Sequence, residues 1–124
     1  MIIQIDTTAS SPIYEQLRNQ IVLGIASGQL TPGEDLPSVR RLAADLGINF
    51  HTVNKSYAML SDEGYIQMDR RRGAIIAQMQ PAHDKFAQEL AERLKLAAAE
   101  AICHGINESE YLHMCNLAYK EAKK

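Results

Sequence analysis

The sequence predicts a mainly α-helical fold with one small β-hairpin. Apolar residues recur at helical spacing in five stretches: residues 13–25, 39–46, 53–60, 86–101 and 111–122. Two short apolar runs, residues 65–68 and 74–77, flank a charged turn, which is typical of a hairpin. Proline or glycine separates the periodic stretches, so the helices are expected to be distinct elements.

The composition limits the class of protein. A length of 124 residues suits about one domain and excludes a large catalytic domain beside a binding domain. A hydrophobic content of 46% and a charged content of 23% are typical of a soluble globular protein. No apolar run approaches the roughly 18 residues of a membrane span, and Met1–Asp6 has no basic region before a longer apolar core. We therefore expect a cytoplasmic protein without a membrane partner, in which Cys103 and Cys115 are reduced.

The first segment is expected to lead into a helix. Ile2, Ile3 and Ile5 form an apolar patch that would be an edge strand or an extended arm. Ser11-Pro12 offers an N-cap followed by a proline at the first helical position. The helix is expected to end near Gly28, and a tight linker follows over residues 29–36. The apolar stripe of the helix consists of Ile13, Leu17, Ile21 and Ile25, with Tyr14 and Val22 beside it.

The stretch after the linker has the spacing of a helix-turn-helix. Ser38 is expected to be the N-cap of a short helix, and Ala43, Gly47 and Val53 stand where two helices would approach, turn and pack. Asn49 would cap the second helix. Its inward residues would be Val53, Tyr57 and Leu60, and its outward residues near the N-terminal end would be Phe50, His51, Thr52, Asn54 and Lys55.

A basic hairpin follows this second helix. Gly64 would end the helix, and two short strands, residues 65–68 and 74–77, would flank the tip Asp69–Gly73. Three arginines at the tip suit phosphates or a narrow minor groove, although a solvated charged turn is the plain alternative. Residues 1–79 are thus expected to form a winged helix-turn-helix domain.

The charge distribution favours a nucleic-acid partner. Between Ser38 and Arg72 there are six basic and four acidic residues, a net charge of +2, whereas the whole chain carries −2. A basic module on an acidic body is expected of a specific binder with limited phosphate contact. The candidate contacts to double-stranded DNA are Ser38, Arg40, Arg41, Asn49, Phe50, His51, Thr52, Asn54, Lys55, Arg70, Arg71, Arg72 and Gly73.

These residues resemble a known family. The stretch from Leu36 to Ala77 is similar to the DNA-binding domain of GntR-type bacterial transcription regulators, and the opening SPIYEQLRNQI and the linker LTPGEDLPS match as well. The resemblance covers about the first two thirds of the chain. Its matching elements are Pro37-Ser38, Arg40, Leu42-Ala43, Gly47, Thr52-Val53, Leu60, Gly64 and Gly73.

The resemblance implies roles at the matching positions. Arg40 would reach a base edge or a phosphate, Thr52 would bind a phosphate, and the wing around Gly73 would enter the minor groove. Two residues depart from the family pattern: Arg71 stands where wings usually carry a glycine, and Phe50 stands where relatives often have arginine or proline. Phe50 would either touch a thymine methyl or pack against the wing, and His51 would either contact DNA or be a solvent-exposed residue of the cap region.

The tail, residues 80–124, is predicted to be a helical hairpin. One helix would run from Ala82 to near Gly105, and Asn107 with Glu110 resembles a capping box that starts another. This tail is too short for the ligand-binding or aminotransferase-like domains of other GntR branches, and it resembles the short tail of the YtrA-type branch.

A lone hairpin cannot bury both faces of its apolar stripe against a small winged helix. We therefore expect a homodimer, whose two recognition helices would read an inverted-repeat operator about one DNA turn, roughly 34 Å, apart. The tail could also respond to an unknown small-molecule effector. The predicted dimerisation residues are Phe86, Leu90, Leu94, Tyr111 and Met114.

The sequence does not favour catalysis or metal binding. Cys103-His104 and His113 with Cys115 lack the spacing of a metal site, so buried thiols and surface histidines are expected. Asp84, Glu89 and Glu92 lie on an exposed helix pattern without a nucleophile or a phosphate loop. We expect neither enzyme activity nor a metal or cofactor.

The main alternative is a winged helix that binds RNA or another protein. The outward polar and cationic residues favour duplex DNA, because a protein interface would present apolar anchors, and only Phe50 fits that description. The sequence thus predicts a sequence-specific transcription regulator, and the family resemblance implies a repressor.

Overall fold

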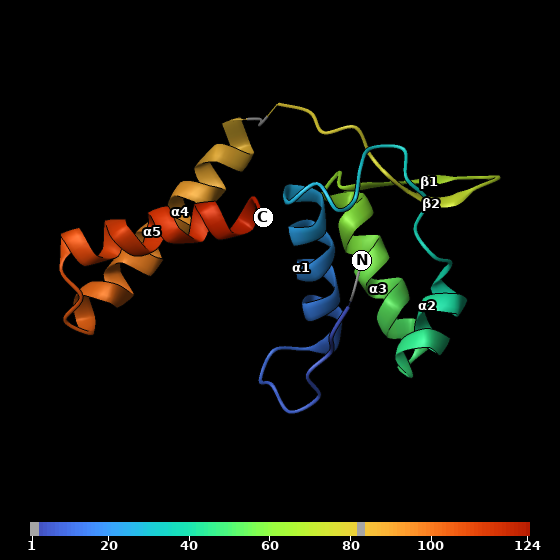
Figure 1. The fold of residues 1–124 in the computed structure, drawn as a ribbon, viewed down its shortest axis with the longest axis horizontal. Helices are drawn as coiled ribbons and strands as arrows, with labels where there is room; N and C mark the ends of the chain where they lie inside the picture. The colour runs from blue at the N-terminus through green and yellow to red at the C-terminus, as the bar shows by residue number, and fades with distance from the viewer. Residues whose placement is uncertain (1–2, 82–83) are drawn as a thin grey trace. The chain divides into compact units, whose positions relative to one another are not determined.

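The computed structural model of the protein describes residues 3–81 and 84–124. Within these ranges the chain forms five helices and a two-stranded antiparallel sheet, divided between two compact units, Met1–Met79 and Gln80–Lys124 (Figure 1). The predicted class, mainly α with a small β wing, is confirmed. The elements are α1 (Ile13–Ala26), α2 (Val39–Leu46), α3 (Phe50–Asp62), β1 (Ile66–Asp69), β2 (Gly73–Ile76), α4 (Asp84–Cys103) and α5 (Glu108–Ala122).

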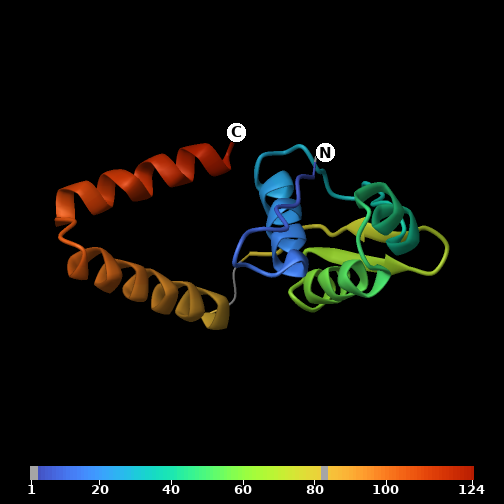
Figure 2. The same ribbon diagram turned by 90° about the horizontal axis from the view of Figure 1, so that it is seen from below.

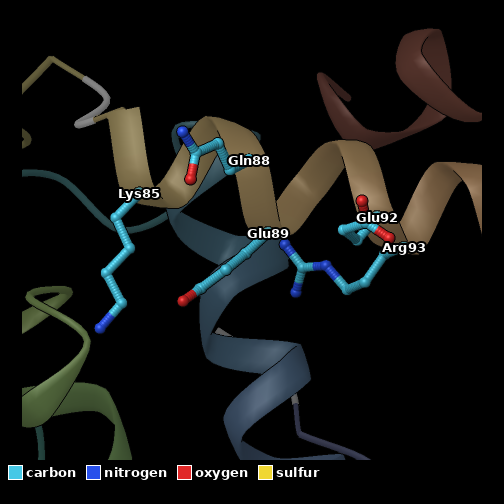
Figure 3. A pocket seen from close by; sticks show the side chains of 5 residues that line it. All are labelled: Lys85, Gln88, Glu89, Glu92 and Arg93. Carbon is cyan, nitrogen blue, oxygen red and sulfur yellow. The ribbon is translucent and has the colours of Figure 1, made fainter.

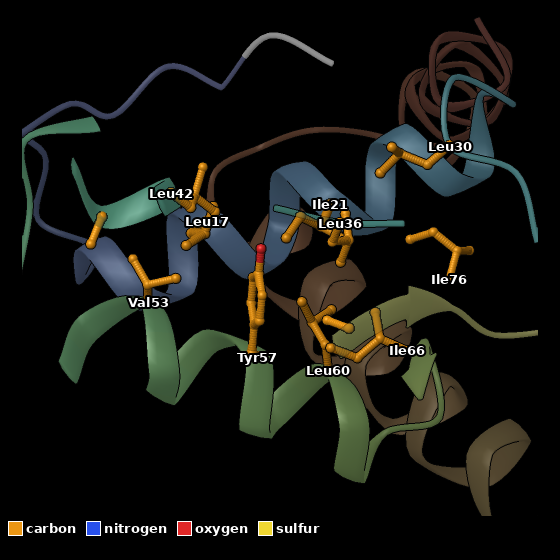
Figure 4. Close-up of a cluster of buried hydrophobic side chains, with 12 residues drawn as sticks. Leu17, Ile21, Leu30, Leu36, Leu42, Val53, Tyr57, Leu60, Ile66 and Ile76 are labelled. Carbon is orange, nitrogen blue, oxygen red and sulfur yellow. The ribbon is translucent and has the colours of Figure 1, made fainter. Parts of the chain in front are cut away.

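The core of the first unit lies between α1, α3 and the sheet (Figure 4). Leu17 and Ile21 of α1 are fully buried against this core, as are Val53 and Leu60 of α3. Ser56 is the buried polar residue of this unit, and its hydroxyl donates a hydrogen bond of 2.6 Å to the carbonyl oxygen of Tyr14. That bond fixes α3 against α1, so the N-terminal end of α3 has a rigid support.

The N-terminal segment is an arm rather than an edge strand. Ile3 and Ile5 pack against the core, while Ile2 lies outside the described residues. The side-chain amides of Gln16 and Gln20 accept bonds of 2.9 Å from the backbone N–H groups of Asp6 and Gln4, and both donate back to the carbonyls of the same residues. Two glutamine side chains one helical turn apart therefore satisfy backbone hydrogen-bonding groups of the arm, as a neighbouring strand would.

Helix α1 begins one residue later than predicted. Pro12, not Ser11, is the N-cap, with φ −61° and ψ 150° and no side-chain capping bond. Because ψ is extended, Pro12 lies outside the helix, while its carbonyl accepts from the backbone N–H groups of Glu15 and Gln16, both at 3.1 Å. The end is close to the prediction, since α1 stops two residues before Gly28.

The helix-turn-helix has the predicted local structure. The Ser38 hydroxyl accepts from the Arg41 backbone N–H at 3.1 Å, and the Asn49 side chain accepts from that of His51 at 2.7 Å. Gly47 closes α2 in the left-handed conformation, with φ 67° and ψ 34°. Tyr57 is a core residue as expected; its hydroxyl donates to the carbonyl of Pro37 at 2.8 Å, and burial raises its pKa.

The wing strands are displaced by one residue from the predicted ranges. Asp69 and Gly73, predicted to belong to the tip, pair with each other, so the turn consists of Arg70, Arg71 and Arg72. The linker forms a short antiparallel β-bridge with β2, between Asp35 and Ile75. The backbone N–H of Leu36 donates to the carbonyl of Ala74, and the backbone N–H of Ile76 donates to the carbonyl of Glu34, each at 2.9 Å. The predicted linker thus anchors the wing.

The second unit is an open helical hairpin. The side chain of Asn107 accepts from the Glu110 backbone N–H at 2.9 Å, which confirms the predicted cap of α5, while the predicted start of α4 at Ala82 lies outside the described residues. Figure 2 shows the two helices separating from their connecting turn. Near that turn Ala101 is buried, and the Tyr111 hydroxyl donates to the Leu94 carbonyl at 3.3 Å.

Candidate nucleic-acid interface

The N-terminal end of α3 presents the polar residues predicted for it. His51, Asn54 and Lys55 are exposed, and Thr52 is half-buried beside the core residue Val53. Helical periodicity separates this outward set from Val53, Tyr57 and Leu60, which face the core. The outward residues are thus held on a rigid face of the first unit.

Lys55 has a neighbour that the sequence did not indicate. Its ammonium group lies 3.9 Å from the centroid of the Tyr14 ring, which α1 brings to this end of α3. Tyr14 was expected only beside the apolar stripe of α1. A cation over an aromatic face is attracted by the negative π-cloud, so the direction of the Lys55 side chain is restricted.

Phe50 lies against α2. The guanidinium carbon of Arg40 is 5.4 Å from the centroid of the Phe50 ring, and the His51 ring meets it edge-on at 5.6 Å. Arg40, Ala43 and Phe50 line a shallow hollow between α2 and α3. Contact with a thymine methyl and packing against the wing were the two positions expected for Phe50, and the structure places its ring against Arg40 of α2.

The start of α2 adds two exposed cations, Arg40 and Arg41. Arg41 lies 3.8 Å from Asp45 one turn later, but both side chains are largely exposed, so this ion pair is weak. Ser38 is occupied by its capping bond to the backbone. The cations of α2 are therefore available to a ligand, while Ser38 chiefly fixes the start of the helix.

The wing tip is organised by Asp69. One oxygen of this carboxylate accepts from the backbone N–H groups of Arg72 at 2.9 Å and Arg71 at 2.7 Å, and these bonds lower the pKa of Asp69 below its ordinary value. A charged cap on two successive N–H groups keeps the turn tight. The arginine side chains therefore project from a defined loop rather than from an unstructured one.

The three wing arginines are not equivalent. Arg72 donates to the Asp35 carboxylate at 2.8 Å from Nε and to the carbonyl of Gly33 at 2.7 Å. Its guanidinium also forms an ion pair with Asp35 at 2.7 Å. All three arginines are exposed, and the contacts to Asp35 and Gly33 distinguish Arg72, which ties the wing to the linker, from Arg70 and Arg71. The prediction treated all three as one set, because nothing local in the sequence marks Asp35 as a partner.

The remaining candidate chemistry has no assembled site. Cys103 is exposed rather than buried as expected, and Cys115 is half-buried. Among residues 3–81 and 84–124, no three metal-ligating side chains come together. A hollow along α4 is lined by side chains of mixed charge that occupy one polar face of this helix: Lys85, Gln88, Glu89, Glu92 and Arg93 (Figure 3). In the same described ranges, no helix is both long and apolar enough to cross a membrane.

Comparison with known proteins identifies the family. The model of the bacterial regulatory proteins of the gntR family matches residues 9–76. The HTH-type transcriptional regulator Rv1152 of Mycobacterium tuberculosis is 33% identical over 97 residues, which are 78% of this chain and 80% of that protein. The HTH-type transcriptional repressor YtrA of Bacillus subtilis is 45% identical over 76 residues, which are 61% of this chain and 58% of that protein.

The whole chain also resembles a solved structure. The crystal structure of a transcriptional antiterminator from Listeria monocytogenes EGD-e is similar with a TM-score of 0.95 and 26% sequence identity, covering 100% of this chain and 94% of that one. The relatives and the family are transcription regulators rather than enzymes. The chain therefore belongs to the gntR family of bacterial regulatory proteins and is a transcription regulator with a DNA-binding domain.

Proposed function

We propose that this regulator binds duplex DNA sequence-specifically, with the N-terminal end of α3 in the major groove and the wing on phosphates or in the minor groove. The observation that carries the proposal is the exposed polar end of α3 beside the cations of α2 on a rigid core. An α-helix fits the major groove of B-DNA, where base pairs differ in their donor and acceptor patterns. Residues 1–79 would be the DNA-binding domain.

The predicted contact residues divide by the part they would play. The candidates for direct contact are exposed or half-buried on α2, α3 and the wing tip: Arg40, Arg41, Phe50, His51, Thr52, Asn54, Lys55, Arg70 and Arg71. Ser38, Asn49 and Arg72 are engaged within the chain, and they would position the others. Gly73, paired with Asp69 in the sheet, would hold the tip.

We also propose that residues 80–124 form a homodimer. The predicted dimerisation residues Phe86, Leu90 and Leu94 are 41%, 40% and 50% exposed along one face of α4, and Met114 of α5 is 53% exposed. An apolar face of this extent is unusual on a monomer. Its burial against a second copy would remove the apolar surface from water, which is favourable. Two copies related by a two-fold axis would read an inverted-repeat operator.

The dimer is tested by placing one charge on either face of α4. Leu94→Glu introduces a carboxylate into the apolar face, and Gln88→Glu introduces the same group into the polar face (Figure 3). We expect wild type and Gln88→Glu to scatter light as dimers at micromolar concentration and Leu94→Glu to be a folded monomer. A wild-type chain that is monomeric and folded at that concentration would contradict the dimer.

The proposed sign of regulation rests on a relative that is named as a repressor. YtrA of Bacillus subtilis is a transcriptional repressor, and a dimer bound to an operator within a promoter would block access of the polymerase. We therefore propose a repressor acting on cytoplasmic DNA, with residues 80–124 as the segment through which an unidentified small molecule would act. Reporter expression from a promoter that carries the operator tests the sign, and an increase with the protein present would contradict repression.

RNA binding is the second candidate, because the similar Listeria protein is described as a transcriptional antiterminator. The deep, narrow major groove of A-form RNA cannot admit α3, whereas that of B-DNA can. The discriminating experiment titrates the protein with a random 30-base-pair duplex, its single strands and an RNA hairpin pool at several salt concentrations. We expect the duplex to bind most tightly at every salt concentration, and preference for the RNA pool would favour antitermination.

A further inference from the structure

We propose that the hollow between α2 and α3 receives the 5-methyl group of a thymine, and that Phe50 and Arg40 determine specificity for this base and its neighbour. This inference rests on the proposed function and specifies which feature of the DNA the regulator reads. Phe50, the first residue of α3, is 40% exposed and stands where the family resemblance leads us to expect arginine or proline.

The hollow has an apolar floor and one cationic wall. It is open to solvent, has a volume of about 310 Å³ and is lined by Ala43, Phe50 and Arg40. Ala43 is 7% exposed and forms the floor, while Phe50 is 40% exposed, so part of its ring remains open to a ligand. Phe50 is the first residue of α3, and Arg40 is the second of α2. The hollow thus opens at the end of α3 that would enter the groove.

The chemistry of this lining selects among base edges. In the major groove, thymine is the base that presents a methyl group, whereas adenine and cytosine present amino donors. Ala43 and the Phe50 ring offer no acceptor, so an amino group placed against them would lose its hydrogen bond to water without replacement. A methyl group loses nothing comparable and gains from the burial of apolar surface.

Arg40 extends the contact to an adjacent base pair. Its guanidinium lies 5.4 Å from the Phe50 centroid, and attraction to the π-face holds the planar group beside the hollow. A guanidinium is a pure donor and pairs best with the O6 and N7 acceptors of guanine. With the thymine methyl in the hollow, the donors of Arg40 reach the next base, so each half-site is expected to contain thymine beside guanine.

The His51 ring meets Phe50 edge-on at 5.6 Å. Contacts from Arg40 and His51 together limit the rotation of the Phe50 side chain, and a restricted ring loses less entropy when it binds a methyl group. The side chains of Arg40, Phe50 and His51 therefore form one preorganised set for base recognition. Arginine or proline at position 50 could not form this set.

The test removes one methyl group at a time from the DNA. Duplexes are first selected from a random pool with the wild-type protein, and each thymine of the recovered motif is then replaced singly by deoxyuridine, which lacks only the 5-methyl group. Binding is measured for wild type, Phe50→Ala and Phe50→Leu, with Lys55→Ala as a matched control on the same face. Because Phe50 is exposed, the variants are expected to fold, and thermal melting checks this.

We expect one deoxyuridine position in each half-site to lower wild-type affinity by about four-fold, the value of one buried methyl group. Phe50→Ala is expected to lose this penalty, Phe50→Leu to retain most of it, and Lys55→Ala to bind more weakly while keeping the penalty unchanged. A recovered motif in which no deoxyuridine weakens wild type, or in which Phe50→Ala keeps the same penalty, would overturn this inference alone. Failure to recover any duplex motif would overturn the proposed function with it.

Discussion

Arg72 shows how a single residue changes the interpretation of the wing. Three consecutive arginines suggest three phosphate contacts, but the Arg72 guanidinium is held by the Asp35 carboxylate and the Gly33 carbonyl. Asp69 holds the backbone of the same turn. Arg72 and Asp35 therefore join the wing to the linker, and Arg70 and Arg71 are the arginines for which we propose DNA contact at the tip.

Asp35→Ala is expected to weaken duplex binding, even though it removes a negative charge from a DNA-binding protein. Loss of the partner frees Arg72 and loosens the wing from the linker. Asp45→Ala is the matched control, because Asp45 is an exposed acid only 3.8 Å from Arg41, and its loss should leave affinity unchanged or raise it. Fluorescence anisotropy measures both affinities. Equal gains for the two variants would show that Asp35 acts through charge alone.

Arg70→Ala tests the tip itself. We expect weaker binding to all duplexes alike and a salt slope reduced by about one for each wing, because one phosphate contact is lost. Thermal stability should stay close to that of wild type, since Arg70 is exposed. Affinities at several salt concentrations give the slope, and an unchanged slope would leave Arg70 as part of a solvated turn.

At the scale of elements, sequence signals that span only a few residues predicted the helix caps correctly. The caps Ser38, Asn49 and Asn107 were predicted from residue type and spacing, and each makes its capping bond. These signals work because cap, turn and helix lie within a few residues of each other. The start of α1 was misplaced by one residue, since Ser-Pro fits two registers.

Gly47 carries the turn of the helix-turn-helix, with a left-handed φ of 67° and open space around the position of an added Cβ. Gly47→Ala is therefore expected to lower the free energy of unfolding by about 1–2 kcal/mol through backbone conformation alone. Gly47→Asn should lower it less, because asparagine tolerates this region. Urea unfolding measures both, and an equal loss for the two would point to packing instead.

Contacts between distant elements could not be predicted. Asp35 and Arg72 are 37 residues apart, and their pairing depends on the linker joining the sheet edge. The stacking of Arg40 on Phe50 depends on the angle at which α2 meets α3, which no periodicity encodes. The wing strands were displaced by one residue because alternation marks a strand but does not fix its ends.

At the scale of the whole molecule, the two units differ in how they bury apolar surface. The first has a continuous core from α1 to the wing. Among the described residues of the second, Ala101 is the buried apolar residue, while large side chains of both helices stay exposed. A dimer would resolve this difference.

Folding of the second unit should consequently depend on protein concentration. We expect the melting temperature of this unit to rise by roughly 7 °C for each tenfold increase, because association stabilises only the folded state. Leu94→Glu should melt at the same temperature at every concentration. Circular dichroism at 222 nm follows both proteins, and a wild-type midpoint independent of concentration would argue against an interface formed by α4 and α5.

On the proposed function, two copies of this chain read a duplex operator through α3 and the wing. The most direct test is selection of bound duplexes from a random pool with the intact wild-type protein, followed by sequencing. We expect an inverted repeat whose half-sites are centred about one helical turn, roughly 10 base pairs, apart. Recovery of a single unrepeated site would contradict the dimer, and recovery of no preferred sequence would contradict sequence-specific reading of DNA.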